Sequence, residues 1–377
     1  MILILILILC IYVVTIAQLI WGFDKIKFYT VSENKPKTFF AIVVPFRNER
    51  DNLPRLLESF KNLNYPIDLF EIILVDDFSE DDSVRQVYNW RMENGKFQTT
   101  LLENISISGS PKKDAISRAI PIIKNEWVIT TDADCVVPQN WLLTLDNYIQ
   151  NHDVAMIAGA VSYECEKSFL HYFQQLDLVS LQGATIGSFG MGLGFMCNGA
   201  NFCYKKSLFN ALDGFARNNN IASGDDVFLL QQAVRMHASK VHYLKSNEAI
   251  VKTKPAESWK ALLHQRVRWA SKTRSYQSVF GKDLAAIVFA GNLAIVAGWF
   301  LLAFKLLGWQ YIVILFAVKC SFDFMLLYKT NTFLSGKPMR FLLLGSLLYP
   351  FFCVVVALYS LRGKYEWKGR VLQTKSK

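Results

Sequence analysis

The sequence predicts an α/β domain with a mainly parallel sheet, flanked by transmembrane helices towards both ends of the chain. Residues 1–23 form an apolar run that is long enough to span a hydrocarbon core of about 30 Å. From Thr38, apolar strands alternate with helical patterns, as they do in βαβ units. After Asp283 about three more apolar runs follow, at 284–304, 306–327 and 341–361. We therefore expect an anchor at 1–23, an α/β domain at 38–280, membrane segments at 284–361 and a basic tail at 362–377.

The first apolar run could be a cleaved signal peptide or a membrane anchor. It has neither the basic leader nor the small-residue cleavage site of a signal peptide. Basic residues mark the cytoplasmic side of a membrane span, and four lysines follow this run: Lys25, Lys27, Lys35 and Lys37. We therefore expect an uncleaved anchor, with the following domain in the cytoplasm.

The α/β domain opens with two strands, each followed by a helix. The first strand covers 39–44 and ends at Pro45, and apolar residues then recur at helical spacing over 53–60. The second strand covers 71–75, and the serine and acidic residues after it can cap a helix that runs to Asn94. Both strands end in a polar cluster.

A weaker strand near Thr100 leads to a helix that starts at Lys112, and a further strand covers 127–131. That strand stops at Asp132 and Asp134, which at strand spacing point to the same side. Two carboxylates on one side repel each other unless a cation compensates, so the pair indicates a divalent metal with oxygen ligands. The alternative is a solvated loop after a strand.

The polar clusters all follow strands of the expected parallel sheet. In open α/β sheets this carboxyl edge is where ligands bind. The chain has no phosphate-binding P-loop and no Gly-x-Gly-x-x-Gly after the first strand. A bound nucleotide would therefore depend on carboxylates and a metal.

Composition excludes two other classes of protein. The net charge is +10, but the basic residues are dispersed and no nucleic-acid-binding signature accompanies them, so we expect no nucleic-acid partner. The 7 cysteines include no Cys-x-x-Cys, which argues against a zinc site and a disulfide framework.

Together these residues resemble a membrane-bound glycosyltransferase of family 2, which has the GT-A fold, a Rossmann-like α/β domain. The matching motifs occur in the family's order, each at an expected strand end or helix start. They are Val43-Val-Pro45-Phe-Arg47-Asn48-Glu49, Val75-Asp76-Asp77-Phe-Ser79, Lys112-Lys-Asp-Ala115 and Asp132-Ala-Asp134.

The second half of the chain continues the resemblance. Cys197-Asn-Gly199-Ala200-Asn201 is similar to the family's acceptor-side loop, although a simple turn between strands would look the same. Ser223-Gly-Asp225-Asp226 occupies the position of the family's Glu-Asp, where the second acid is the base. Acids at a helix start are also favoured by the helix dipole without any chemistry.

Gln265, Arg268 and Trp269 match the family's Gln-x-x-Arg-Trp motif and share one helical face. Arginine grips phosphate and a flat aromatic ring packs against sugars, so this face suits diphosphate and acceptor contacts. An amphipathic helix at the membrane surface is the alternative.

The resemblance implies an inverting transfer from a UDP- or GDP-sugar to a lipid-linked or polysaccharide acceptor at the cytoplasmic membrane face. Asp226 would be the catalytic base, and Asp132 and Asp134 would hold Mg²⁺ or Mn²⁺. The implied donor-binding residues are Pro45, Arg47, Glu49, Asp76, Asp77, Lys112 and Asp132, and the implied acceptor and diphosphate residues are Asp225, Gln265, Arg268 and Trp269. Rival functions are a metal-dependent phosphohydrolase and a membrane scaffold with a degenerate transferase domain.

Four further features bear on the membrane region. Residues 169–181 fit either an interfacial or a core helix, and the glycines at 183–194 fit either a flexible loop or ordinary structure, so neither segment predicts a site. Lys319 and Asp323 lie one helical turn apart and could pair inside a bundle. Three full C-terminal crossings would put the basic tail outside, against the charge rule, so the crossing number stays open; the tail's charges are Arg362, Lys364, Lys368, Arg370, Lys375 and Lys377.

Overall fold

The computed structural model describes residues 2–32, 34–166, 168–216, 221 and 224–361, together with the backbone of two short strands at 364–367 and 370–373. The chain divides into two compact units. One contains residues 1–26, 165–195 and 255–365, and the other contains 27–164, 196–254 and 366–377. The expected domain at 38–280 is therefore shared between the units, and the segments 165–195 and 255–280 belong with the apolar helices.

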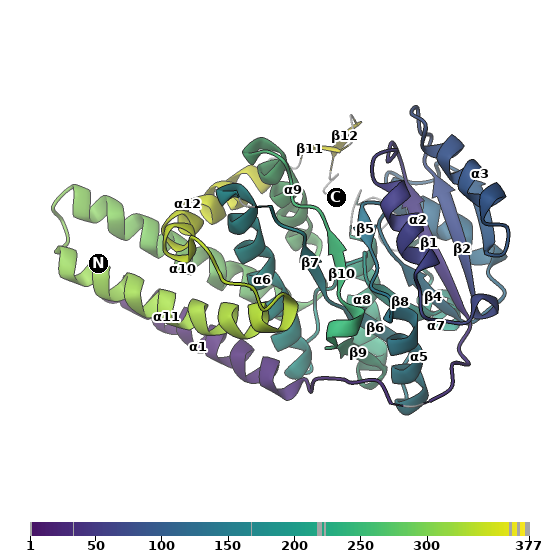
Figure 1. Cartoon of the computed structure of the whole chain (residues 1–377). Helices are drawn as coiled ribbons and strands as arrows, with labels where there is room; N and C mark the ends of the chain where they lie inside the picture. The colour runs from purple at the N-terminus through teal and green to yellow at the C-terminus, as the bar shows by residue number, and fades with distance from the viewer. Residues whose placement is uncertain are drawn as a thin grey trace. The chain divides into compact units, whose positions relative to one another are not determined.

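The α/β unit is built on a sheet that, in the described part of the chain, has seven strands in the order β3-β2-β1-β4-β8-β6-β9 (Figure 1). β1, β2, β3 and β4 are mutually parallel where they pair, while β8 runs antiparallel to both of its neighbours. The strands are β1 (Phe40–Phe46), β2 (Phe70–Asp76), β3 (Gln98–Glu103), β4 (Trp127–Thr130), β6 (Met156–Gly159), β8 (Phe202–Lys205) and β9 (Val241–Leu244). This confirms the expected α/β class with a mainly parallel sheet.

Helices and a small second sheet complete the unit. The second sheet has the order β5-β10-β7, from β5 (Cys135–Val136), β7 (Val161–Tyr163) and β10 (Val251–Thr253). The helices are α2 (Leu53–Lys61), α3 (Ser83–Glu93), α4 (Pro111–Ala119), α5 (Trp141–Asn151), α7 (Lys206–Ala211) and α8 (Asp225–His237). The apolar residues at helical spacing in α2 are buried in one core cluster with alternate residues of β1 and β2, which explains why this segment folds as an amphipathic helix; they are Leu53, Leu56, Leu57 and Phe60.

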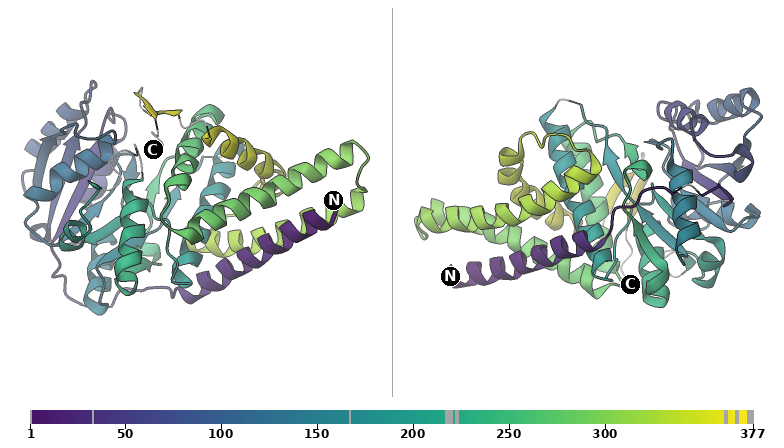
Figure 2. Two further views of the ribbon diagram at one scale, coloured as in Figure 1. Left: turned by 180° about the vertical axis from the view of Figure 1, so that it is seen from behind. Right: turned by 60° about the horizontal axis from the view of Figure 1, so that its bottom comes forward.

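The other unit consists of long helices packed side by side (Figure 2). They are α1 (Ile2–Lys25), α6 (Phe169–Gly190), α9 (Trp259–Ser271), α10 (Val279–Ala303), α11 (Trp309–Leu334) and α12 (Leu342–Ser360). Among the described residues, four of them, α1, α10, α11 and α12, are long and apolar enough to cross a membrane. Of the expected basic tail, Arg362, Lys368, Lys375 and Lys377 lie outside the described residues, and Lys364 and Arg370 are described only as backbone, in β11 (Lys364–Trp367) and β12 (Arg370–Gln373).

The glycines at 183–194 begin in a helix rather than in a loop. α6 continues to Gly190, and a side chain at Gly187 or Gly190 would overlap the backbone of α1 at Leu19 and Gly22. Small residues let helix backbones approach this closely in membrane proteins. These glycines therefore pack α6 against the N-terminal helix.

The expected pair of Lys319 and Asp323 forms within α11. Lys319 Nζ lies 2.6 Å from Asp323 Oδ2, and the Tyr12 hydroxyl of α1 donates to Asp323 Oδ1 at 2.6 Å. The pair thus also ties α11 to α1, a contact that the spacing within α11 cannot reveal.

Candidate functional site

The polar clusters after β1, β2 and β3 meet at one edge of the sheet. The parallel register places Phe46 opposite Asp76 and Asp76 opposite Glu103, so the strands end level with one another. The residues that follow these strands are consequently brought together. This is the edge at which the sequence predicts ligand binding.

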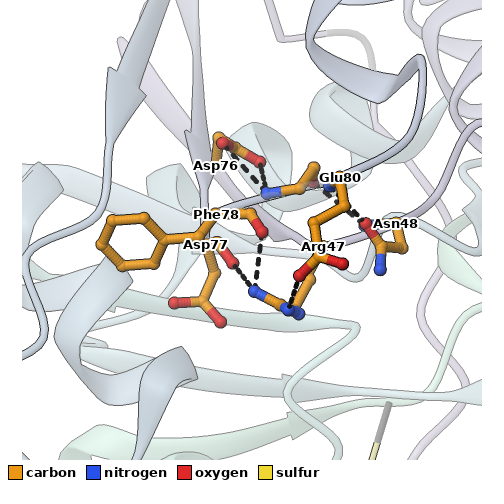
Figure 3. Close-up of polar contacts among 7 residues, drawn as sticks. Arg47, Asn48, Asp76, Asp77, Phe78 and Glu80 are labelled. Carbon is orange, nitrogen blue, oxygen red and sulfur yellow. Dashed lines mark hydrogen bonds and ion pairs between the residues drawn. The ribbon is translucent and has the colours of Figure 1, made fainter. Parts of the chain in front are cut away.

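Arg47 fastens the loop after β2. Its Nη1 donates to the carbonyl oxygens of Asp77 and Phe78, both at 2.7 Å, and its Nη2 lies 2.8 Å from Glu80 Oε1 (Figure 3). Asn48 joins the same loops, because its Oδ1 accepts from the Glu80 N–H at 2.8 Å. Arg47 is buried, so its observed task is to shape the loop around the two aspartates, while the expected direct contact with a donor stays a prediction.

Two residues in these loops have left-handed backbone conformations. Asn48 has φ 51° and Phe78 has φ 57°. Asparagine tolerates this region, whereas a bulky residue is strained there by about 1–3 kcal/mol. The Arg47 bond to the Phe78 carbonyl helps to hold this conformation. Such local strain is typical of loops shaped for binding.

Asp76 and Asp77 are buried and oriented by neighbours from two segments. The Asp76 carboxylate accepts the N–H of Ser79 at 3.1 Å, and Asp77 Oδ1 accepts from Asn104 Nδ2 at 2.8 Å. The Asn104 N–H also donates to the Asp76 carbonyl at 2.8 Å. Sequence reasoning missed Asn104, although its place directly after β3 is the same signal that singled out the other polar residues.

Pro45 and Glu49 lie at the same edge and are half-buried. Pro45 is in register with Val75 of β2. Glu49 accepts from Asn52 Nδ2 at 2.7 Å, and its backbone N–H donates to Ser83 Oγ at 2.7 Å. Both residues therefore stand beside the aspartate loop, as the motif order predicts.

The expectation of strand spacing at Asp132 and Asp134 is wrong. β4 ends at Thr130, and residues 132–135 form a turn in which the Cys135 N–H donates to the Asp132 carbonyl at 3.1 Å. Backbone bonding to β1 stops at this point, so the chain is free to turn before β5. Both residues lie in this turn and remain half-exposed at the end of the sheet.

Lys112, at the start of α4, connects this turn to α8. Its Nζ lies 2.6 Å from Asp132 Oδ1 and 3.6 Å from Asp225 Oδ2. Burial disfavours the ammonium ion, but the nearby carboxylates of Asp132, Asp225 and Asp226 outweigh that effect and raise the pKa of Lys112 above its usual range. Lys112 is therefore a fixed positive charge at the centre of the site.

Asp226 is held by backbone donors on two sides. Its Oδ2 accepts the N–H of Gly199 at 2.7 Å and its Oδ1 accepts the N–H of Val227 at 2.8 Å. A Cβ at Gly199 would lie 2.9 Å from Lys112 Nζ and 3.3 Å from Asp225 Oδ2, so the loop approaches these charges closely only because it has no side chain there. Asp226 is half-buried and Asp225 is buried. Ser223, which precedes this pair, lies outside the described residues.

Asp132 and Asp134 fit a hard divalent cation. Carboxylates are the ligands that Mg²⁺ and Mn²⁺ prefer, and such ions often take only one or two protein carboxylates when phosphate oxygens and water complete the shell. Over the residues that the structure describes, no group of three or more His, Cys, Asp or Glu side chains could hold a metal ion alone. The residues present thus suit a cation that is shared with a phosphate-bearing ligand.

Gln265, Arg268 and Trp269 lie on α9, in the unit of apolar helices, and are half-buried. The expected helix is confirmed. Gln265 Oε1 accepts from Arg266 Nη1 at 2.5 Å, and the Arg266 guanidinium lies 4.2 Å from the centroid of the Trp269 ring. The motif is therefore ordered by a neighbour that the motif itself does not include.

Two protein-family models match the chain. The model of glycosyl transferase family 2 matches residues 41–212, and that of glycosyl transferase family group 2 matches residues 127–361, which is more than half of the chain.

Individual relatives are more distant. The chain is 26% identical over 253 residues to the probable glycosyltransferase YdaM of Bacillus subtilis, which covers 65% of this chain and 57% of that protein. It is 24% identical over 238 residues to the beta-monoglucosyldiacylglycerol synthase of Trichormus variabilis, covering 62% and 48%. The chain thus spans about half the length of these curated relatives.

Among solved structures, the mannosyltransferase PcManGT of Pyrobaculum calidifontis has a TM-score of 0.63 and 15% identity, covering 96% of this chain and 98% of that one. At this identity the likeness concerns the fold, which is of the GT-A type. Taken with the family models and the arrangement of the motifs, it leads to one conclusion: the chain belongs to glycosyltransferase family 2.

Proposed function

We propose that the protein is an inverting glycosyltransferase that moves a sugar from a nucleotide-diphospho-sugar to a lipid-linked or polysaccharide acceptor at the cytoplasmic face of a membrane. The observation that carries the proposal is the contact of Lys112 with both Asp132 and Asp225. Through Lys112, a carboxylate suited to a metal and the acid pair of α8 lie in one site. Transfer from a diphosphate requires the metal and the base to be this close together.

The edge formed by β1, β2 and β3 would hold the nucleoside. Asp76 and Asp77 would accept hydrogen bonds from it, since both carboxylates are already oriented by Ser79 and Asn104. Pro45, Arg47 and Glu49 would shape this part of the site. The donor would be a UDP- or GDP-sugar; PcManGT, which shares the fold, was solved with GDP-Man and Mn²⁺.

Asp132 and Asp134 would hold Mg²⁺ or Mn²⁺ against the diphosphate. When bound, the cation supplies Lewis-acid stabilisation of the negative charge that develops on the leaving diphosphate. Lys112 would contribute a second positive charge to the same phosphates, at no cost in protonation because its pKa is raised.

Asp226 would act as the base. An acceptor hydroxyl attacks the anomeric carbon as the bond to the diphosphate breaks, and the hydroxyl proton passes to the Asp226 carboxylate. Attack from the face opposite the leaving group inverts the anomeric centre, so an α-linked donor gives a β-linked product. Asp225, which is buried beside Lys112, would help to hold the lysine in place. Contacts with the acceptor and the diphosphate would come from Gln265, Arg268 and Trp269.

The acceptor that we favour is a lipid carrying a hydroxyl or a sugar, with one or a few transfers. The four candidate spans provide few helices for an enclosed polymer channel, and as membrane helices they would bring the enzyme next to lipids. The name of the beta-monoglucosyldiacylglycerol synthase supports a glycolipid product for a relative. Long polymer made by the purified chain alone would contradict this choice.

The test is product analysis with membranes that contain the full chain, supplied with a panel of UDP- and GDP-sugars. We expect a glycosylated lipid and free nucleoside diphosphate in equal amounts. A phosphohydrolase would release phosphate or sugar phosphate without a new glycoside, and a scaffold would consume no donor. Asp226→Asn should abolish transfer and leave donor binding intact; a greater loss of turnover in Asp225→Asn would exchange the roles of the two acids.

A further inference from the structure

Arg266 lies inside the Gln265 to Trp269 segment of α9 and uses three sides of its guanidinium group. Its Nε donates to Asp177 Oδ2 of α6, and its Nη1 donates to Gln265 Oε1 at 2.5 Å. Its guanidinium carbon lies over the Trp269 ring, 4.2 Å from the ring centroid. One cation thus contacts Gln265 and Trp269, which are two of the three α9 side chains to which the proposed function assigns substrate contacts.

The ion pair beneath these side chains is buried. Arg266 and Asp177 are each only 4% exposed. Two well-packed apolar residues would generally stabilise a fold as well as a buried ion pair does. Stability alone therefore does not explain why the chain has an ion pair here. The contacts of Arg266 with Gln265 and Trp269 on α9 offer an explanation.

We propose that Asp177 and Arg266 are positioning residues that fix the orientation of Gln265 and Trp269 for transfer. The proposal rests on the proposed function, in which the Gln265 amide and the Trp269 ring contact the leaving diphosphate and the acceptor sugar. Asp177 fixes the guanidinium group through the hydrogen bond from Nε. The guanidinium group in turn fixes the side chains of Gln265 and Trp269.

The chemistry of the glutamine amide shows what this fixing achieves. A guanidinium group only donates hydrogen bonds, so Gln265 must turn its carbonyl oxygen towards Arg266. Its NH₂ group then points to the other side and offers two donors, which match diphosphate or sugar oxygens. A flipped amide would bring donor against donor and present an acceptor to the phosphates instead.

The cation–π contact acts in the same way on the tryptophan. Arg266 covers one face of the Trp269 ring and is itself held by Asp177, so the ring orientation is set by a planar and rigid group. Lysine could keep the charge at this position, but its ammonium group could not reproduce the forked hydrogen bonds and the planar group over the ring.

The experiment compares Asp177→Asn and Arg266→Lys in the full chain, assayed in membranes with the donor that the unmodified chain uses. We expect kcat to fall by about 10- to 100-fold, as for a misplacement of roughly 1 Å, with a much smaller change in the KM for the donor. The matched control is Asp323→Asn, which breaks the ion pair with Lys319 elsewhere in the same helical unit. It should lower Tm without lowering kcat.

A double-variant cycle separates positioning from simple support of the fold. In a Gln265→Ala background, Arg266→Lys should have at most about half of its effect on kcat in logarithmic units, because one of the groups it orients is gone. Fully additive effects, or an equal loss of kcat in Asp323→Asn, would overturn the positioning role.

Failure of this proposal can be told apart from failure of the proposed function. If Gln265→Ala lowers transfer while Asp177→Asn leaves kcat unchanged, only the positioning role falls. If Gln265→Ala and Trp269→Ala both leave transfer unchanged, these side chains do not contact the diphosphate or the acceptor as proposed. The positioning role of Asp177 and Arg266 is then contradicted as well.

Discussion

Lys112 Nζ lies 2.6 Å from Asp132 Oδ1, and the same ammonium group lies 3.6 Å from Asp225 Oδ2. The lysine thus balances the charge of two carboxylates that come from segments far apart in the sequence. Asp225 is buried, so its carboxylate depends on this neighbour more than the half-exposed Asp132 does.

Lys112→Gln should destabilise the α/β unit. Removing the cation takes away a positive charge that lies 3.6 Å from the buried Asp225 carboxylate. The expected cost is about 1–3 kcal/mol, and it is discounted because the Lys112 side chain is 26% exposed. We expect Tm of the purified protein to fall by several degrees, and Asp225→Asn added to Lys112→Gln should restore part of the loss. An unchanged Tm in the single variant would contradict this account.

The stabilising effect of Lys112 should not depend on pH in the neutral range. Its pKa is higher in the folded state than in the unfolded state, so its contribution is complete below the unfolded value of about 10.5 and is lost only as the pH rises through the folded value. The difference in Tm between the wild type and Lys112→Gln should stay constant from pH 6 to pH 9, as thermal unfolding at several pH values would measure. A difference that shrinks towards pH 9 would argue that the lysine is not held as the structure has it.

Asp134→Asn should abolish metal-dependent transfer. Two carboxylates next to a diphosphate repel it strongly without a compensating cation, and the variant removes half of the protein's charge on that cation. Titration of activity and of Mn²⁺ binding in the same preparation would measure the effect. Asp153→Asn, at an exposed acid elsewhere in the unit, is the matched control. Activity that persists in excess chelator would exclude the metal assignment.

Gly199→Ala should lower activity with little effect on folding. The new Cβ would lie 2.9 Å from Lys112 Nζ and 3.4 Å from Asp226 Cβ, so the lysine or the loop must shift and the bond from the Gly199 N–H to Asp226 is disturbed. We expect kcat to fall by about 10- to 100-fold. Gly95→Ala provides the comparison, since a Cβ there meets nothing within 4 Å. Equal kinetics in both variants would show that Asp226 does not need this close approach.

We predict that α10, α11 and α12 are membrane segments, and the side on which the tail lies tells how many of them cross. α10 and α11, of 25 and 26 residues, exceed the length that a bilayer requires, and α12 has 19 residues without a single charge. A cysteine is placed at Lys375 in a background without native cysteines, and labelling of it by an impermeant reagent from outside would mean three crossings. Protection of that cysteine, together with labelling only after the membrane is opened, would mean that one helix enters the bilayer without crossing it.

The sequence alone determined those features that depend on local periodicity. Short apolar runs and helical spacing predicted the strands of the parallel half of the sheet and the helices between them, and the polar residues after each strand predicted the edge at which the site forms. The long apolar runs predicted the helices suited to a membrane, and Lys319 and Asp323 pair because a helix brings residues four apart together. Each of these follows from a few neighbouring residues.

The tertiary structure decided which distant groups meet. Asp132 and Asp134 lie in a turn rather than on a strand because the ladder between β4 and β1 ends before them. Arg47 donates to the carbonyl oxygens of the loop after β2, and Arg266 donates to Asp177. Both contacts join segments that are far apart in the sequence. No local sequence pattern predicts either side-chain orientation. The rotamer that a side chain adopts depends on the partners around it, and the packing of strands and helices across the whole chain determines those partners.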